Sequence, residues 1–368
     1  MKPSQPPPVG SRSAYTTGPN VRRRRCLKLA AGGLAAASLG FVQRWANAAA
    51  AVAPGTAEPA EPAEPVNQPG PYQMLEMEWI DTSRRRAVPV RLYLPAQRAD
   101  AIPNANPGGV PLVVFSHGIG GSRRGYSWLG RHIAGQGLAC LHLQHVGSDS
   151  ALWFGNIMGL LGRLRDAAQA TEAIDRVLDL SFALDTLLAS DLASRIDTRH
   201  IIAAGHSYGA NTALLACGAR VPKDGRQIDL QDRRFSAAIV ISAPPFYGQS
   251  DFRDILSPVV VPSLHITATE DVIRIPGYYS GLEDRLAVFE ATGSTRKWLA
   301  VFEGGSHSMF TDRSGSGGVM LNGRVKEASK TLTTAFLRAV LQRDERLLAR
   351  WPQQHGEILS RFMGPAST

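Results

Sequence analysis

Residues 201–217 read IIAAGHSYGANTALLAC, and the fold class can be inferred from this segment. Residues 201–204 are short and apolar, which predicts a buried strand, whereas the small residues from 210 onward predict a helix. Between them, residues 205–209 match the pattern G-x-S-x-G. This pattern is weak alone, but a strand before it and a helix after it are the setting in which it forms a sharp turn that exposes the serine. Ser207 is therefore the candidate nucleophile.

Outward from this turn, short apolar runs alternate with segments of helical periodicity. Strands are predicted at 111–116, 138–143, 201–204, 237–242, 263–267 and 298–302, and helices at 126–136, 165–188, 211–217 and 318–341. Residues 73–80 and 87–94 predict an antiparallel hairpin at the N-terminal side. The expected fold is therefore of the α/β class, with a mostly parallel central sheet, an N-terminal hairpin and helices on both faces.

Two further motifs carry a family resemblance. Residues 115–121 read FSHGIGG, and residues 126–134 read YSWLGRHIA. With the turn at 205–209, they resemble the α/β-hydrolase superfamily, specifically the bacterial cutinase-like, platelet-activating-factor-acetylhydrolase-like and dienelactone-hydrolase-like esterases. The resemblance spans roughly residues 73–342 and implies the α/β-hydrolase fold and a serine esterase. Dienelactone hydrolases use a cysteine where this chain has Ser207, so their chemistry is not transferred.

The nucleophile needs a base, which in this superfamily follows the serine in the chain. Of nine histidines, His265, His307 and His355 follow Ser207. His265 lies in an apolar predicted strand and His355 in the C-terminal tail. His307 lies directly after the last predicted strand, where the resemblance places the base, and it is predicted to deprotonate Ser207. His206 is expected to serve in packing.

The base needs a carboxylate that orients its ring. Asp271 ends the segment PSLHITATED, which resembles the superfamily pattern P-x-L-x-I-x-G-x-x-D, with Ala268 in place of the usual glycine. Asp271 is the predicted acid. The adjacent Glu270 is its main rival, and Asp251 and Asp254 are weaker rivals.

The tetrahedral intermediate of acyl transfer carries a negative oxygen that backbone N–H groups stabilise. The resemblance places one donor directly after the nucleophile, at Tyr208, and the other in the loop 117–121, where Ile119 is predicted. Glycines at 118, 120 and 121 allow a close approach of the backbone to a substrate. His117 is expected to order this loop.

Residues 1–48 resemble a twin-arginine export signal. Residues 23–28, RRRCLK, match the pattern R-R-x-[apolar]-Leu-Lys, and the apolar stretch 29–42 is too short and too weakly hydrophobic for a stable membrane span. Residues 46–48, ANA, offer a cleavage site ending at Ala48. The expectation is recognition by the twin-arginine translocase and a periplasmic or secreted location. An uncleaved anchor helix or a basic tail are the alternatives.

The rest of the chain is divided by composition. Residues 49–71 are rich in Pro, Ala and Glu and predict a disordered linker. Residues 72–345 are expected to form the catalytic domain and residues 346–368 a C-terminal tail. The net charge is +9, but residues 1–48 hold eight basic and no acidic residues, which leaves +1 for the rest. This balance predicts no nucleic-acid partner.

No motif predicts a cofactor, and no Cys/His cluster has the spacing of a metal site. Cys140 and Cys217 are expected to lie apart as buried thiols.

The expected reaction is cleavage of a small-molecule or polymeric carboxylic ester through an acyl-enzyme. Alternatives on the same triad are an acyltransferase, a peptidase or a cutinase-like polyester hydrolase. A non-catalytic protein on this fold is disfavoured because all three triad candidates are present. Residues 144–164 either shape an acyl pocket or cap, or pack on the core.

Overall fold

The structure is a computed structural model that describes residues 71–96, 109–246, 248–249, 251–275, 278–312 and 319–365. The predicted export signal at 1–48 lies outside the described residues, as does the predicted linker at 49–71 except for Pro71.

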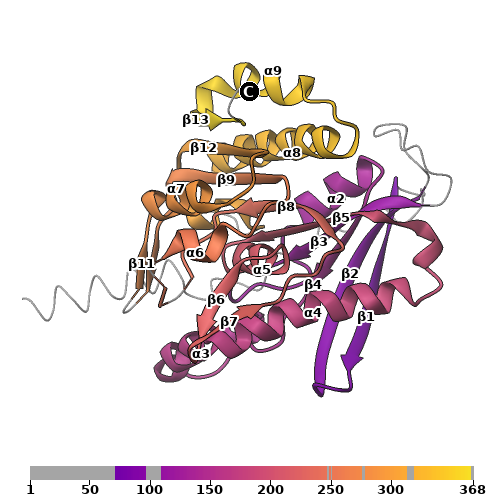
Figure 1. Cartoon of the computed structure of the whole chain (residues 1–368), viewed down its shortest axis with the longest axis vertical. Coiled ribbons are helices and arrows are strands. Elements are labelled where there is room, and N and C mark those ends of the chain that lie inside the picture. Colours follow the sequence, from indigo (N-terminus) through magenta and orange to yellow (C-terminus); the bar gives the residue numbers. More distant parts are fainter. Residues whose placement is uncertain are drawn as a thin grey trace, which may run out of the picture. The chain divides into compact units, whose positions relative to one another are not determined.

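A nine-stranded sheet forms the centre of the fold (Figure 1). In spatial order its strands are β1 (Tyr72–Asp81), β2 (Arg86–Pro95), β4 (Ala139–Leu143), β3 (Val110–Ser116), β5 (Ile196–His206), β8 (Phe235–Ile241), β9 (Ser263–Glu270), β12 (Lys297–Ser306) and β13 (Leu359–Met363). The run from β4 to β12 is parallel, whereas β1, β2 and β13 join antiparallel. The predicted N-terminal hairpin and mostly parallel sheet are confirmed. Two small hairpins lie outside the sheet, β6 (Arg220–Lys223) with β7 (Arg226–Asp229) and β10 (Ile273–Ile275) with β11 (Tyr278–Ser280).

Helices cover both faces of the sheet. They are α2 (Ser127–Gly135), α3 (Leu160–Ala167), α4 (Ala170–Leu188), α5 (Tyr208–Ala216), α6 (Phe252–Leu256), α7 (Leu282–Ala291), α8 (Val319–Leu341) and α9 (Arg346–His355), with 3₁₀ turns η1 (Ser150–Trp153), η2 (Ile157–Gly159), η3 (Ala193–Arg195), η4 (His307–Phe310) and η5 (Gly356–Ile358). One apolar cluster joins α4, α5 and α6 to the sheet, and a second joins α2, α8 and α9. In Figure 1, α4 lies beside β1 and β2, and α8 and α9 lie beside β12 and β13.

The side chains of β3 show why its sequence is apolar throughout. Leu112 and Val114 belong to the cluster with α4 and α5, whereas Val113 and Phe115 belong to the cluster with α2 and α8. Successive side chains of a strand point to opposite faces, so a strand covered on both sides needs an apolar residue at every position. The predicted buried strand at 111–116 is confirmed.

Two segments differ from the sequence expectation. The helix predicted over 165–188 is two helices, because Gln169 takes an extended conformation between α3 and α4. The residues after 345, expected to be a tail, form α9, η5 and β13, and β13 pairs antiparallel with β12 at the edge of the sheet.

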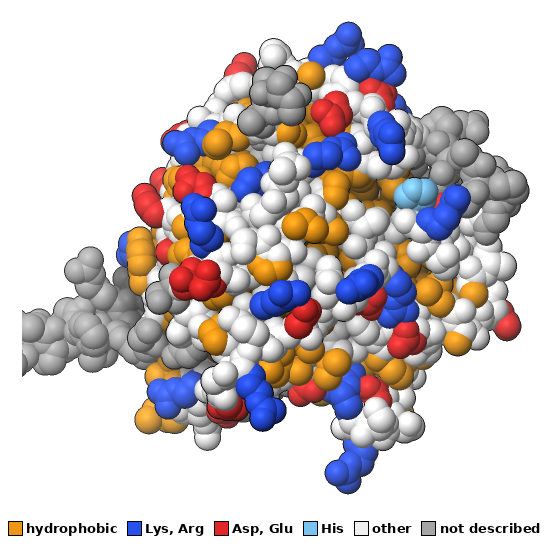
Figure 2. All heavy atoms as spheres, in the orientation of Figure 1, with side chains coloured by type: hydrophobic (Ala, Val, Ile, Leu, Met, Phe, Trp, Pro, Cys, Tyr) orange, Lys and Arg blue, Asp and Glu red, His pale blue; other side chains and the backbone are white. Residues whose placement is uncertain are grey.

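Figure 2 shows Lys and Arg side chains interspersed with Asp and Glu side chains over the face that it presents. In the ranges that the structure describes, no helix combines the length and the apolar character needed to cross a bilayer. Cys140 and Cys217 are both buried free thiols, as predicted.

Candidate active site

Ser207 occupies a sharp turn between the end of β5 and the start of α5. Its φ of 55° and ψ of −123° are unusual for a residue with a side chain and are a form of backbone strain found at functional sites. Its N–H donates to Ile241 O at 2.8 Å, which ties the turn to the end of β8. A Cβ at Gly205 would overlap the carbonyl of Gly209, and a Cβ at Gly209 would overlap the carbonyl of Ser116. The turn therefore requires glycine at both positions.

Three side chains from distant parts of the sequence form a hydrogen-bonded chain at this turn. His307, the first residue of η4 after β12, has its Nε2 2.8 Å from Ser207 Oγ. Its Nδ1 lies 2.6 Å from Asp271 Oδ1, in the turn after β9. A carboxylate only accepts hydrogen bonds, so Nδ1–H donates to Asp271 and Nε2 is left to accept the Ser207 hydroxyl proton. The structure thus brings together the predicted nucleophile, base and acid.

The surroundings of Asp271 keep it ionised. Burial alone would raise the pKa of this carboxyl, but His307 and the guanidinium of Arg285 outweigh burial and hold the pKa well below its usual range. Arg285 Nη2 lies 3.4 Å from Asp271 Oδ1, and Thr267 Oγ1 donates to Oδ2 at 2.7 Å. Arg285 lies on α7, and sequence analysis did not single it out, because neither that helix nor its proximity to Asp271 was predicted.

The rival acids are placed elsewhere. The side chain of Glu270 is exposed, and the hydrogen-bond partner of His307 Nδ1 is Asp271. Asp251 caps the N-terminus of α6 by accepting from Asp254 N–H. Of the four carboxylates considered, the geometry therefore favours Asp271 as the partner of His307.

The rival bases are likewise occupied. His265 is buried on β9 and bonds to Ser263 Oγ at 3.1 Å, and burial lowers the pKa of its imidazole to about 3. His355 on α9 bonds to Thr331 Oγ1 at 3.1 Å. Both rings serve structural contacts away from Ser207.

The loop 118–121 lies against the nucleophile. A Cβ on Gly118 would be 3.2 Å from Ser207 Cβ. Within the loop, Gly120 N–H donates to Ser148 O at 2.8 Å and Gly121 N–H to Gly118 O at 3.0 Å. Across the residues that the structure describes, the N–H groups of Ile119 and Tyr208 have no hydrogen-bond partner. These two predicted donors are therefore free to bind an oxyanion.

His117 orders this loop, as predicted. Its Nδ1–H donates to Gly118 O at 2.6 Å, and its Nε2 accepts from His145 N–H at 3.1 Å. Burial holds the pKa of the His117 imidazole well below its usual value, so the ring is neutral. Both ring nitrogens are used within the protein, which leaves neither for proton transfer to a substrate.

His206 does more than pack, which corrects the sequence interpretation. Its Nε2–H donates to His307 O at 3.0 Å, and its Nδ1 accepts from the Tyr126 hydroxyl at 2.8 Å. The same hydroxyl accepts a long hydrogen bond of 3.4 Å from Gly118 N–H. His206 thus links the backbone of the base to the loop 118–121. No local sequence pattern indicates this link, because its partners come from distant segments.

Part of the segment 144–164 packs on the loop 118–121. Trp153 Nε1–H donates to Gly120 O at 2.7 Å, and its indole ring lies where a Cβ of Gly120 would be. Trp153 and Ile119 pack together against a small cluster of buried residues that includes Leu152. Phe154 is 76% exposed and Met158 is 88% exposed at the outer side of this segment. The segment therefore supports the loop and presents apolar side chains to solvent.

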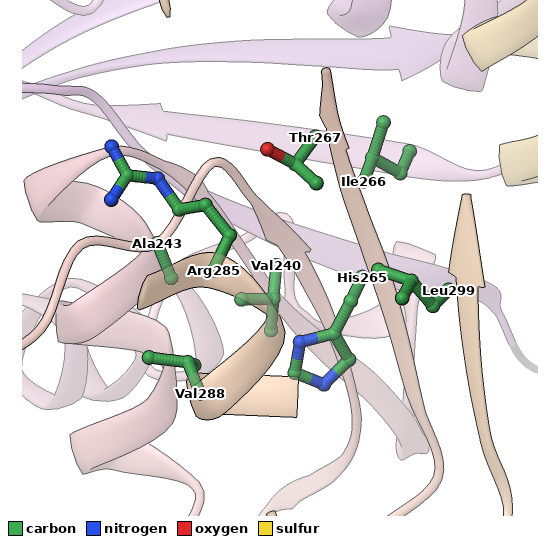
Figure 3. A pocket seen from close by; sticks show the side chains of 8 residues that line it. All are labelled: Val240, Ala243, His265, Ile266, Thr267, Arg285, Val288 and Leu299. Carbon is green, nitrogen blue, oxygen red and sulfur yellow. The ribbon is translucent and has the colours of Figure 1, made fainter. Parts of the chain in front are cut away.

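A small cavity lies behind the predicted acid, between β9 and α7 (Figure 3). Its volume is ≈ 10 Å³, and Thr267 and Arg285 lie toward one end and His265 toward the other. This volume suits about one water molecule and excludes any ester. The cavity borders the surroundings of Asp271 and is not a substrate pocket.

Comparisons with known proteins concern one stretch of the sequence and the fold. Residues 86–158 match the sequence family of platelet-activating factor acetylhydrolase, isoform II. That stretch contains the loop with Ile119 but not Ser207, Asp271 or His307. Among solved structures, ferulic acid esterase from Streptomyces cinnamoneus aligns with a TM-score of 0.57 and 22% sequence identity, covering 83% of this chain and 98% of that chain. Comparison with curated protein sequences gives no match. With the sheet topology, the structural likeness establishes the α/β-hydrolase fold.

Proposed function

We propose that this protein is a serine hydrolase that cleaves carboxylic esters through an acyl-enzyme on Ser207. The observation that carries the proposal is the continuous hydrogen-bond chain from Ser207 Oγ through His307 to Asp271. A second support is the pair of unoccupied N–H groups at Ile119 and Tyr208, beside the nucleophile. Together these groups supply a nucleophile, a base, an orienting acid and oxyanion donors, which are the parts that acyl transfer requires.

The proposed reaction has two steps. Ser207 Oγ attacks the ester carbonyl carbon while His307 Nε2 takes the hydroxyl proton, and the carbonyl oxygen becomes an oxyanion that faces Ile119 and Tyr208 N–H. The alkoxide leaves with the proton from His307, and the acyl group stays on Ser207. Water then gives a proton to His307 and attacks the acyl carbon. The bond from the acyl carbon to Ser207 Oγ breaks, Oγ takes the proton back from His307, and the carboxylic acid is released. Asp271 holds the ring orientation and stabilises the imidazolium in both steps.

An ester is favoured over other acyl substrates by the two comparisons. The matched family is named an acetylhydrolase and the structural neighbour is named an esterase. An acyltransferase, a peptidase and a polyester hydrolase would use the same three side chains. Experiments on different substrates therefore have to distinguish these activities.

A p-nitrophenyl ester series from acetate to laurate, with a peptide p-nitroanilide beside it, tests the reaction class. We expect hydrolysis of acetate and butyrate and no cleavage of the anilide. Ser207→Ala should lower the rate at least about 10³-fold, because it removes the attacking oxygen. A fluorophosphonate probe should label Ser207. Folded protein that resists the probe, or that transfers the acyl group to an added alcohol faster than to water, would overturn the proposal of an ester hydrolase.

A matched pair of variants tests the acid. Asp271→Asn removes the carboxylate that bonds to His307 Nδ1, so we expect kcat to fall about 10³- to 10⁴-fold. Glu270→Gln makes the same chemical change at the adjacent exposed carboxylate and should leave kcat within about twofold of wild type. Loss of activity in the Glu270 variant alone would reverse the assignment.

We also propose that the chain is exported by the twin-arginine translocase and cleaved after Ala48, on the strength of residues 23–28 and 46–48. N-terminal sequencing of protein from the native host tests this. A mature start at residue 49 in the periplasm or medium is expected. An intact Met1 on membrane-bound protein would contradict it.

A further inference from the structure

Arg176, on α4, is fully buried beneath the segments that carry the two proposed oxyanion donors. Its Nη2–H groups donate to the His117 carbonyl and, at 3.0 Å, to Ser116 Oγ. Its Nη1–H donates to Ser148 Oγ at 2.8 Å and its Nε–H to Thr212 Oγ1 at 3.0 Å. One guanidinium therefore contacts three chain segments that meet around Ser207.

The first set of contacts fixes the loop that holds Ile119. Arg176 holds the His117 carbonyl, two residues before Ile119. It also holds Ser148, whose own carbonyl accepts from Gly120 N–H, the residue after Ile119. The loop is thus anchored on both sides of the proposed donor by groups that bond to the same side chain.

The second set of contacts fixes the start of α5. The guanidinium carbon lies 4.5 Å from the centroid of the Tyr208 ring, a cation–π geometry. Thr212 Oγ1 accepts from Arg176 Nε–H and donates to Tyr208 O at 3.0 Å. The residue that supplies the other proposed donor is therefore held by the same side chain, through its ring and through Thr212.

The positive charge of Arg176 is not neutralised by a direct ion pair with any described residue. In the described part of the chain no carboxylate lies within ion-pair distance of its guanidinium, and Glu172 reaches it only through Ser148 Oγ, 2.6 Å from Glu172 Oε1. Burial lowers the pKa of Arg176 to about 10, so the side chain stays charged at neutral pH. A cation behind two N–H donors in a dry interior favours negative charge in front of them.

A buried relay supports Ser116, one of the partners of Arg176. Ser116 Oγ lies 2.8 Å from His145 Nε2, and His145 Nδ1 lies 3.0 Å from Asp179 Oδ2. This Ser–His–Asp chain has the distances of a catalytic triad, but all three residues are fully buried. No substrate reaches Ser116, so the relay orients the oxygen that accepts the hydrogen bond from Arg176 Nη2–H.

We propose that Arg176 is the positioning residue of the oxyanion hole, because it sets the Ile119 and Tyr208 N–H groups relative to each other and places a buried positive charge behind them. This inference rests on the proposed ester hydrolysis and adds a residue that does not touch the substrate. It predicts that loss of Arg176 weakens binding of the transition state more than binding of the ester.

The test compares Arg176→Met and Arg176→Lys with wild type. The readouts are kcat and KM for p-nitrophenyl butyrate and the Ki of a trifluoromethyl ketone that forms an oxyanion on Ser207. We expect Arg176→Met to lower kcat about 10²-fold, to change KM less than about threefold, and to raise Ki by the same factor as kcat falls. Arg176→Lys keeps the charge but loses the fork of donors, so its loss should be intermediate.

The control is Arg91→Met, which removes another buried arginine, on β2, where its partners are Glu76 and Tyr93. It should lower the melting temperature and leave kcat per active site unchanged. If Arg176→Met behaves like Arg91→Met, Arg176 serves folding alone and the proposal is overturned.

Substitutions at two uncharged partners of Arg176 test the proposal if Arg176→Met does not fold. Ser148→Ala and Thr212→Val each remove one acceptor of the guanidinium, and each should lower kcat several-fold with a parallel rise in Ki. Unchanged kcat in both would overturn the proposal. Activity that survives in Ser207→Ala would instead refute the proposed function, whatever the Arg176 variants show.

Discussion

At the scale of the residue, the partner atoms of a side chain decide its role. His117, His206 and His307 all lie close to Ser207, and all have both ring nitrogens bonded within the protein. Only His307 has a nitrogen directed at the nucleophile, and its side chain is 20% exposed. The buried chain from Ser116 to Asp179 reproduces the distances of the triad without access to solvent. Hydrogen-bond geometry therefore identifies a catalytic site only together with exposure.

The chain order of Ser207, Asp271 and His307 could be recognised from the sequence because each follows a strand in a local pattern. Arg176 and Arg285 could not. Within α4, apolar periodicity gave no sign that Arg176 and Asp179 are buried, because their partners come from other segments. A buried charge is tolerated only when distant groups pair with it, and such pairing has no local sequence signature.

One prediction at this scale concerns pH. Arg285 contributes to the low pKa of Asp271, so the carboxylate stays ionised well below neutral pH and does not cause the acid limb of the activity profile. Arg285→Met removes a nearby positive charge, which makes proton uptake by the His307–Asp271 pair easier. The acid limb of kcat/KM should therefore move to higher pH. Rates measured from pH 4 to pH 9 give the shift.

The matched control for the pH experiment is Arg274→Met, which removes an exposed cation from the neighbouring hairpin. Its profile should coincide with that of wild type. If the acid limb of the Arg285→Met profile also coincides with that of wild type, the Arg285 guanidinium does not act on the His307–Asp271 pair. The explanation for the low pKa of Asp271 would then be wrong.

At the scale of the element, β5 and α5 illustrate what local sequence determines. Residues 201–217 predict a strand, a turn and a helix, and β5, Ser207 and α5 occupy those positions, although β5 begins earlier, at Ile196. By contrast, α7, α9, β13 and the two small hairpins were not predicted. They are short or mixed in polarity, and they form because they pack on or pair with segments remote in sequence.

The turn itself yields a stability prediction. Gly209→Ala would place a methyl group on the carbonyl of Ser116, and both groups are backbone, so neither can rotate away. We expect a loss of more than about 2 kcal/mol in the free energy of unfolding. Gly162→Ala, in α3, has open space around the added methyl group and should be neutral or stabilising by up to about 1 kcal/mol. Urea titration of both variants measures the difference, and equal stabilities would contradict the account of the turn.

At the scale of the whole molecule, the sheet order follows from alternation of strand and helix, but its C-terminal edge does not. The sequence predicted the parallel strands up to β12, and it assigned the residues after 345 to a tail. In the structure β13 covers the edge of β12, and α9 packs on α8. The five-residue β13 thus replaces the ten-residue β12 as the outermost strand. A short edge strand offers less backbone for unwanted pairing between chains, so β13 serves solubility as well as stability.

A truncation tests this role of the C-terminal segment. Trp351 on α9 is fully buried and its Nε1–H donates to Ala328 O at 3.1 Å, so a chain ending at 345 would expose α8 and the edge of β12 together. We expect that chain to aggregate or to melt well below the full-length protein, and Trp351→Ala to cost about 3–5 kcal/mol of unfolding free energy. A chain ending at 363 keeps β13 and should melt with the full-length protein. If the chain ending at 345 melts at the temperature of the full-length protein and stays monomeric, α9 and β13 do not contribute to the stability of the domain. The domain would then end at residue 345, as the sequence predicted.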